Sequence, residues 1–236
     1  MKVIGRAGGI SALREAQEEY IPERPPPAQD IINFVKATYQ FVSFPVLAPG
    51  IPLQGPWVFA GGRFTDGDQT FAISQLVMLP EGDIVATTST NDSDLVLEHL
   101  MALMDDNFGF RLRSASKKRS YMSTVVVEFE RSVSDCIDAI SKIEEVINRG
   151  RSSPLPFKSI AFGRDNSILT QENLLLRIES ADFTIERRIA QEPKEQLDNR
   201  YFCNAPMTTD DHIEALEQIE AILREGSIPI SSTRPT

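Results

Sequence analysis

The sequence has few of the side chains on which catalysis and metal binding most often depend. Among its 236 residues there are two histidines, two cysteines and one tryptophan. The cysteines, Cys136 and Cys203, lack the short CxxC spacing that is typical of zinc and redox motifs. We therefore predict no disulfide framework, no metal site and no cofactor.

Familiar catalytic motifs are missing as well. The sequence contains no GxxxxGK[ST] phosphate loop, no GxGxxG dinucleotide motif, no HExxH zinc motif and no GxSxG nucleophile motif. Two histidines also leave little material for general acid–base catalysis. These absences favour a protein that is not an enzyme, and we predict no catalytic residue.

Long apolar runs are absent too. The most apolar stretch, FVSFPVLAPGIPL, is too short to span a bilayer and is interrupted by Pro45, Pro49 and Pro52. No apolar segment of signal-peptide length precedes Glu15. We therefore expect a cytoplasmic protein that does not enter a membrane.

Positive charge is in deficit, because 24 Lys and Arg residues face 34 Asp and Glu residues, for a net charge of −10. This balance argues against a general affinity for DNA or anionic membranes. The local exception is a run of five cations without an acid: Arg111, Arg113, Lys117, Lys118 and Arg119. Two interpretations remain open, a solvated hairpin turn or a contact with nucleic acid or a protein partner.

The composition, with 41% hydrophobic and 25% charged residues, is that of a globular protein. Helical periodicity predicts helices over residues 93–106, 133–148 and 210–224. Extended patterns predict strands over residues 38–44, 57–64, 70–79, 84–90, 120–130, 157–163, 173–179, 183–189 and 200–205. Residues 29–37 suit a helix or part of a strand. Because many turns are short, we predict an α+β fold, a mainly antiparallel sheet with three amphipathic helices packed on it.

Strand runs in the first and last thirds both end in Thr and Asp residues that precede a helix, so an internal duplication is a further hypothesis. For the domains, we predict an N-terminal arm with a Pro-rich spacer at 1–27, one α+β domain at 28–226 and a flexible tail at 227–236. Within the arm, a short helix at 11–20 would place three apolar residues on one face, Leu13, Ala16 and Tyr20. A helix this short needs a partner surface, so these residues are predicted to form an interface.

Two features raise alternatives to simple packing. Arg187 lies in an apolar row of a predicted strand, where its charge needs either a buried carboxylate or an anionic ligand. Glu220 is the predicted carboxylate. His212 and Cys203 are either packed core residues or a Cys–His nucleophile.

From these patterns we predict a non-enzymatic interaction or assembly protein, either self-associating or part of a larger complex. One alternative is a nucleic-acid accessory protein that uses the basic residues of 111–119. The other is an enzyme with a site near His212, Cys203 or Arg187.

Overall fold

A computed structural model describes the sheet, its helices and short adjoining segments. The described residues are 1–14, 26–46, 55–79, 82–110, 118–133, 146, 147, 149, 159–163, 178, 181–187 and 199–225. The strands are β1 (Lys2–Arg14), β2 (Trp57–Asp66), β3 (Gln69–Leu79), β4 (Gly82–Thr87), β5 (Lys118–Glu128), β6 (Ser159–Phe162), β7 (Phe183–Arg187) and β8 (Arg200–Ala205). The helices are α1 (Ala28–Tyr39), α2 (Thr90–Phe108) and α6 (Thr209–Glu225).

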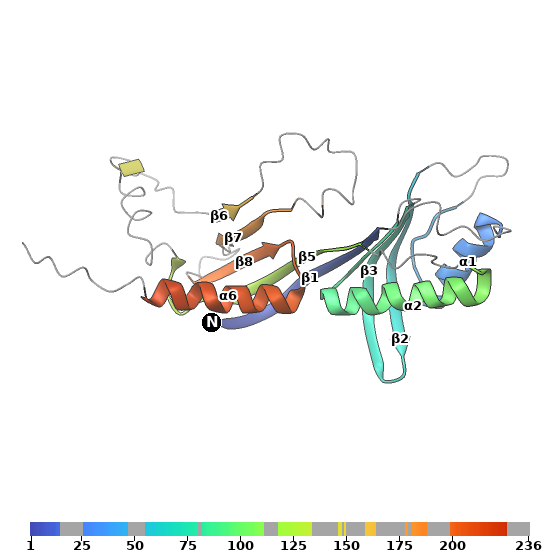
Figure 1. Cartoon of the computed structure of the whole chain (residues 1–236), viewed down its shortest axis with the longest axis horizontal. Helices are drawn as coiled ribbons and strands as arrows, with labels where there is room; N and C mark the ends of the chain where they lie inside the picture. The colour runs from blue at the N-terminus through green and yellow to red at the C-terminus, as the bar shows by residue number, and fades with distance from the viewer. Residues whose placement is uncertain are drawn as a thin grey trace, which may run out of the picture.

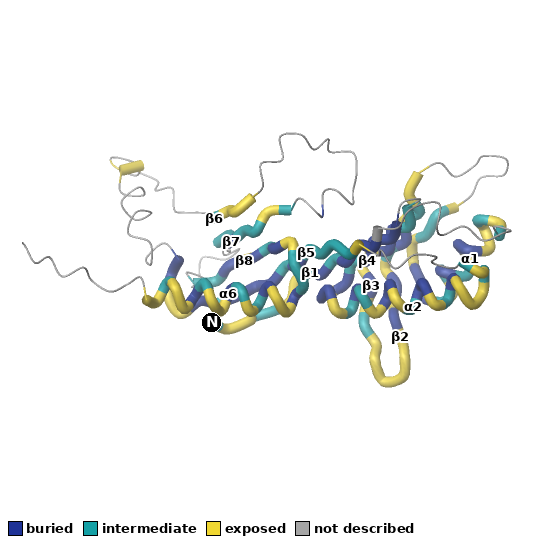
Figure 2. Tube along the Cα trace, viewed as in Figure 1, coloured by how far each residue is buried: buried dark blue, intermediate teal, exposed yellow. Residues whose placement is uncertain are grey.

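The described strands form one antiparallel sheet of eight strands in the order β2-β3-β4-β1-β5-β8-β7-β6. Helices α2 and α6 lie end to end along the sheet, and α1 lies beside the outer half of α2 (Figure 1). Buried and exposed residues alternate along each helix, as expected when one side of a helix packs on a sheet (Figure 2). The predicted α+β class is therefore confirmed.

Helix α2 shows why its sequence pattern was informative. The side chain of Ser89 accepts a hydrogen bond from the backbone amide of Asp92 and caps the N-terminus, and Gly109 ends the helix with φ 69°. The apolar stripe predicted for this helix is buried: Val96, Leu97, Leu100, Met101 and Met104. The last helix, predicted at 210–224, is also present as α6.

Helix α1 resolves the ambiguity at residues 29–37 and corrects the strand predicted at 38–44. The helix continues to Tyr39, and Gln40 closes it in the left-handed region at φ 53°. Its apolar residues have helical spacing and are buried, so packing overrides the preference of Tyr39 for a strand. Beyond the helix, a single β-bridge joins Ser43 to Ala60 of β2.

Most of the helix predicted at 133–148 lies outside the described residues, although Val133 is described and buried. Of the strand predicted at 173–179 only Ile178 is described, and its backbone is helical, so the prediction is wrong at this residue. Ile178 is buried against Ala12, Val77 and Ile84 on the face of the sheet opposite the helices.

The N-terminal segment differs most from prediction. Residues 2–14 are a central strand, paired with β4 on one side and with β5 on the other. The predicted arm is therefore wrong for these residues, and Leu13 is fully buried in the core instead of forming an interface. Ala12 and Leu13 are buried on opposite faces of the sheet, and a strand covered on both faces need not alternate between polar and apolar residues, which is why its pattern was misleading. Ala16 and Tyr20 lie outside the described residues.

The two halves of the sheet have the same strand order from the edge to the centre, β2-β3-β4-β1 and β6-β7-β8-β5. Their pairing registers also correspond. One row of directly paired residues across the first half is Phe59, Leu76, Val85 and Ser11. The equivalent row in the second half is Ile160, Ile185, Cys203 and Val125. Each half therefore places its core side chains in the same relative positions.

Candidate interaction edge and buried polar centre

The first turns of α2 and α6 meet above the middle of the sheet. The amide of Thr90 donates to Oγ1 of Thr209 at 3.0 Å, and the amide of Thr209 donates to Oγ1 of Thr90 at 2.7 Å. Beside them, the side-chain amide of Asn91 donates to Asp210 at 2.9 Å. Because these bonds are reciprocal, each helix supplies an acceptor for an N-terminal amide of the other. They connect the two halves of the molecule.

His212 belongs to this polar centre and is fully buried. Its Nδ1 lies 3.2 Å from the hydroxyl of Ser123, which in turn donates to Thr209 at 3.3 Å. The ring is also edge-on to Phe183, with 5.5 Å between the ring centroids. Burial lowers the pKa of His212 to about 4, so the imidazole is neutral at pH 7. Within the described residues its Nε2 has no hydrogen-bond partner.

Cys203 is fully buried in β8, in the position that Val85 occupies in the other half. Burial raises the pKa of its thiol to about 12, so the reactive thiolate is suppressed. The hydrogen bond of His212 goes to Ser123 and not to Cys203. This geometry matches the packed alternative for both residues and lacks the features of an activated nucleophile.

Glu220 is buried as predicted, but its partners differ from the predicted Arg187. It accepts hydrogen bonds from the Met1 ammonium group, from the amide of Glu130 at 2.9 Å and from Arg224 at 3.1 Å. Although burial alone raises the pKa of Glu220, these hydrogen bonds and the neighbouring positive charges bring the pKa below its ordinary value. Arg187 is half-buried at the end of β7, opposite Tyr201.

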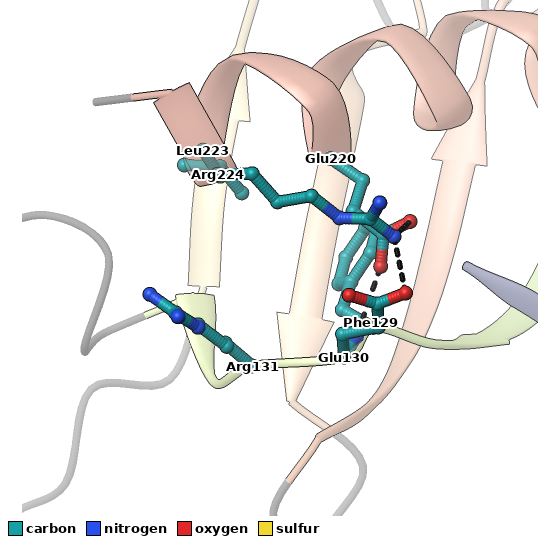
Figure 3. Close-up of a pocket in the computed structure, with 6 residues that line it drawn as sticks. All are labelled: Phe129, Glu130, Arg131, Glu220, Leu223 and Arg224. Carbon is teal, nitrogen blue, oxygen red and sulfur yellow. Dashed lines mark hydrogen bonds and ion pairs between the residues drawn. The ribbon is translucent and has the colours of Figure 1, made fainter. Parts of the chain in front are cut away.

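A small hollow lies beside Glu220 at the end of α6 (Figure 3). Its lining residues are Phe129, Glu130, Arg131, Glu220, Leu223 and Arg224. The space has a volume of about 10 Å³, room for roughly one water molecule. This hollow is therefore too small to hold an organic substrate.

The structure describes two of the five basic residues that were predicted to form a contact, Lys118 and Arg119. Arg111, Arg113 and Lys117 lie outside the described residues, and Lys118 is exposed at the start of β5. Arg119 faces α2, where it pairs with Asp94 at 3.2 Å and with Glu98 at 2.9 Å. A phosphate group would have to compete with these two carboxylates for Arg119.

The two ends of the sheet differ. The edge of β2 is covered by the chain itself, because Ser43 and Ala60 exchange two backbone hydrogen bonds of 3.1 and 2.9 Å. At the opposite end, β6 is the last strand in the sheet order. Its Phe162 has an exposed fraction of 64%. We call the outer side of β6, residues 159–162, the β6 edge, and we take it as the candidate interaction site.

Sequence reasoning did not find the β6 edge, although it predicted a strand at 157–163. The order of strands in a sheet depends on long-range pairing, which local patterns do not encode. The nearest available signal was the four-residue sequence SIAF, which has none of the Lys or Pro residues that often protect an exposed strand edge, although Lys158 directly precedes it.

Comparison with known proteins places the chain in no family: no family model matches it, and no curated protein is similar to it in sequence. Across the described residues, no group of three or more His, Cys, Asp or Glu side chains is arranged to hold a metal ion. Among the described helices, none combines the length and the apolar character needed to cross a membrane.

Proposed function

We propose that this protein is a non-enzymatic interaction or assembly protein that joins other chains through the β6 edge. The observation that carries the proposal is the exposed Phe162 on an end strand whose counterpart at the other end of the sheet, β2, is covered. A strand edge without a neighbouring strand can pair with another chain, and aromatic residues are enriched at protein interfaces.

The symmetry of the molecule supports this proposal. We infer that the two halves arose by duplication of one unit, because β1 to β4 followed by α2 and β5 to β8 followed by α6 have the same order and pairing. The halves join through antiparallel pairing of β1 with β5, as two subunits would join in a dimer. Within the chain the two units associate through the edges of their sheets, and the β6 edge is the equivalent of the β2 edge, which the segment after α1 covers in the first half.

The alternative functions have weaker support. An enzyme that used Cys203 and His212 would need a thiolate and a proton acceptor, and burial disfavours both charged forms. A nucleic-acid protein would need its basic stretch free to bind phosphate, whereas Arg119 is already paired with acids. Interaction with protein, by self-association or within a larger complex, is the function that we retain.

The test compares the native masses of complexes isolated with the full-length protein and with two variants. Phe162→Glu places a charge on the β6 edge, while Ile222→Glu places one at a site of similar exposure on α6, 66% against 64%. We expect Phe162→Glu to run at the mass of the single chain, 26.3 kDa, and Ile222→Glu to retain the wild-type complex. Light scattering after size-exclusion chromatography measures the masses. A wild-type protein that is always a single chain would contradict the proposed function.

A further inference from the structure

We propose that the β6 edge binds an extended segment of a partner protein as an additional strand, with an apolar side chain of that segment resting on Phe162. This inference rests on the proposed function and adds the chemistry of the partner. Addition of a strand to a sheet edge combines backbone hydrogen bonds, which supply affinity, with side-chain contacts, which supply specificity.

The molecule contains an example of this binding mode at its other end. After α1 the chain runs along the edge of β2, where Ser43 and Ala60 exchange backbone hydrogen bonds and the amide of Val42 donates to Gly61 at 3.4 Å. Phe41 lies against the backbone of Gly62, since a Cβ atom at Gly62 would be 2.5 Å from the ring. A short extended segment with an aromatic residue is thus sufficient to cover this edge.

The pairing registers give the equivalent position on β6. In the first half Ala60 pairs with Gln75, which pairs with Ala86 of β4. In the second half the corresponding row is Ala161, Thr184 and Asn204. Ala161 therefore stands where Ala60 stands, with its amide and carbonyl directed away from β7. In the described part of the chain, no residue hydrogen-bonds to Ala161 on that side.

Phe162 provides the apolar contact. It pairs with Phe183 across the two strands, with ring centroids 6.3 Å apart, and Phe183 packs in turn on the core beneath α6. The aromatic surface of the core therefore continues to the β6 edge, where Phe162 is 64% exposed. In the first half the equivalent of Phe162 is Gly61, so the second half has gained a large side chain at its edge.

The overall charge favours a partner protein over a second copy, because two copies meeting edge to edge would bring together chains that each carry −10. Near the β6 edge itself the charges are mixed. Asp182 lies beside Gly163 at one end of the strand, because a Cβ atom at Gly163 would be 2.3 Å from its Oδ1. In the sequence, Lys158 directly precedes Ser159 and Arg164 directly follows Gly163.

The experiment uses the intact protein and a labelled synthetic peptide. The peptide copies residues 40–44, QFVSF, with two lysines added at each end. Fluorescence anisotropy at low salt measures its dissociation constant. We expect saturable binding that is weakened at least tenfold by Phe162→Ala and unaffected by Ile222→Ala. A peptide that is N-methylated at its serine should also bind at least tenfold more weakly, because it loses the backbone donor that Ser43 uses in the folded chain.

The N-methylated peptide keeps the test decisive even where a protein variant folds poorly, because it leaves the protein unchanged. Absence of peptide binding, or equal binding of both peptides, would overturn the inference while leaving the proposed function open to its own mass measurement. A dimer of the purified chain that Phe162→Ala dissociates would also overturn it, because the occupant would then be a second copy. Assembly through the β6 edge would still stand in that case.

Discussion

His212 shows how burial converts a titratable side chain into part of the core. The Nδ1 of its ring hydrogen-bonds to the hydroxyl of Ser123, and no carboxylate of the described residues bonds to the ring. The equivalent first-turn position in α2 is Ser93, which donates to the carbonyl of Gly9 at 2.9 Å. Both halves therefore fasten the helix to the central strands at this point, with different side chains.

The pKa of His212 leads to a prediction about acid stability. The unfolded chain takes up a proton near the ordinary pKa of 6.5, whereas folding lowers this pKa to about 4. Because the unfolded state binds the proton first, stability is lost as the pH falls from roughly 6.5 to 4. The total loss is ~3 kcal/mol for a shift of this size. Urea unfolding of wild type and His212→Gln between pH 7 and pH 4 should show a larger loss in the wild type, and parallel pH profiles would refute it.

The position of Cys203 leads to a prediction about substitution by another apolar residue. Because Val85 fills the equivalent position, Cys203→Val should change the free energy of unfolding by less than about 1.5 kcal/mol. The native thiol should also resist alkylation by iodoacetamide, since burial suppresses its thiolate. Peptide mass spectrometry measures labelling at Cys203 before and after unfolding. Rapid labelling in the native state, or loss of peptide binding in folded Cys203→Val, would return this residue to the list of functional candidates.

At the scale of elements, α2 rests directly on the backbone of β1. A Cβ atom at Gly9 would lie 2.0 Å from the carbonyl carbon of Ser89, whereas one at Gly8 would lie 4.0 Å from the nearest atom, Cβ of Thr124. Gly9→Ala must therefore push the helix away from the sheet. We expect a loss of ~3 kcal/mol for Gly9→Ala and little change for the neighbouring control Gly8→Ala. Equal thermal unfolding of the two variants would contradict this packing.

The elements also show what local sequence can and cannot predict. Helix α2 was predictable because its caps and its stripe from Val96 to Met104 depend on neighbours in the chain. Strand β1 was not, because its pairing with β4 and β5 supplies what its glycine-rich pattern lacks. Arg187 and Glu220 were rightly recognised as residues that need partners, but partner choice depends on tertiary packing. The β6 edge depends on the strand order of the whole sheet and was missed for the same reason.

For the whole molecule, the central position of β1 determines the effect of truncation. Removing residues 1–14 takes away a strand that joins the two halves and the buried side chain of Leu13. The truncated chain is therefore expected to lose cooperative thermal unfolding, as measured by circular dichroism. A folded, cooperative core without these residues would instead restore the idea of a detachable arm.

The continuous sheet is predicted to have one covered end, at β2, and one open end, at β6. Amide hydrogen exchange, resolved at individual residues, tests this claim most directly by comparing Ala60 with Ala161. In the free protein we predict that the Ala60 amide is protected by Ser43, while the Ala161 amide exchanges as an exposed amide does. Upon addition of the lysine-flanked peptide, the Ala161 amide should become protected and Ala60 should not change. Protection of Ala161 in the free protein, or unchanged exchange when the peptide is bound, would contradict the account.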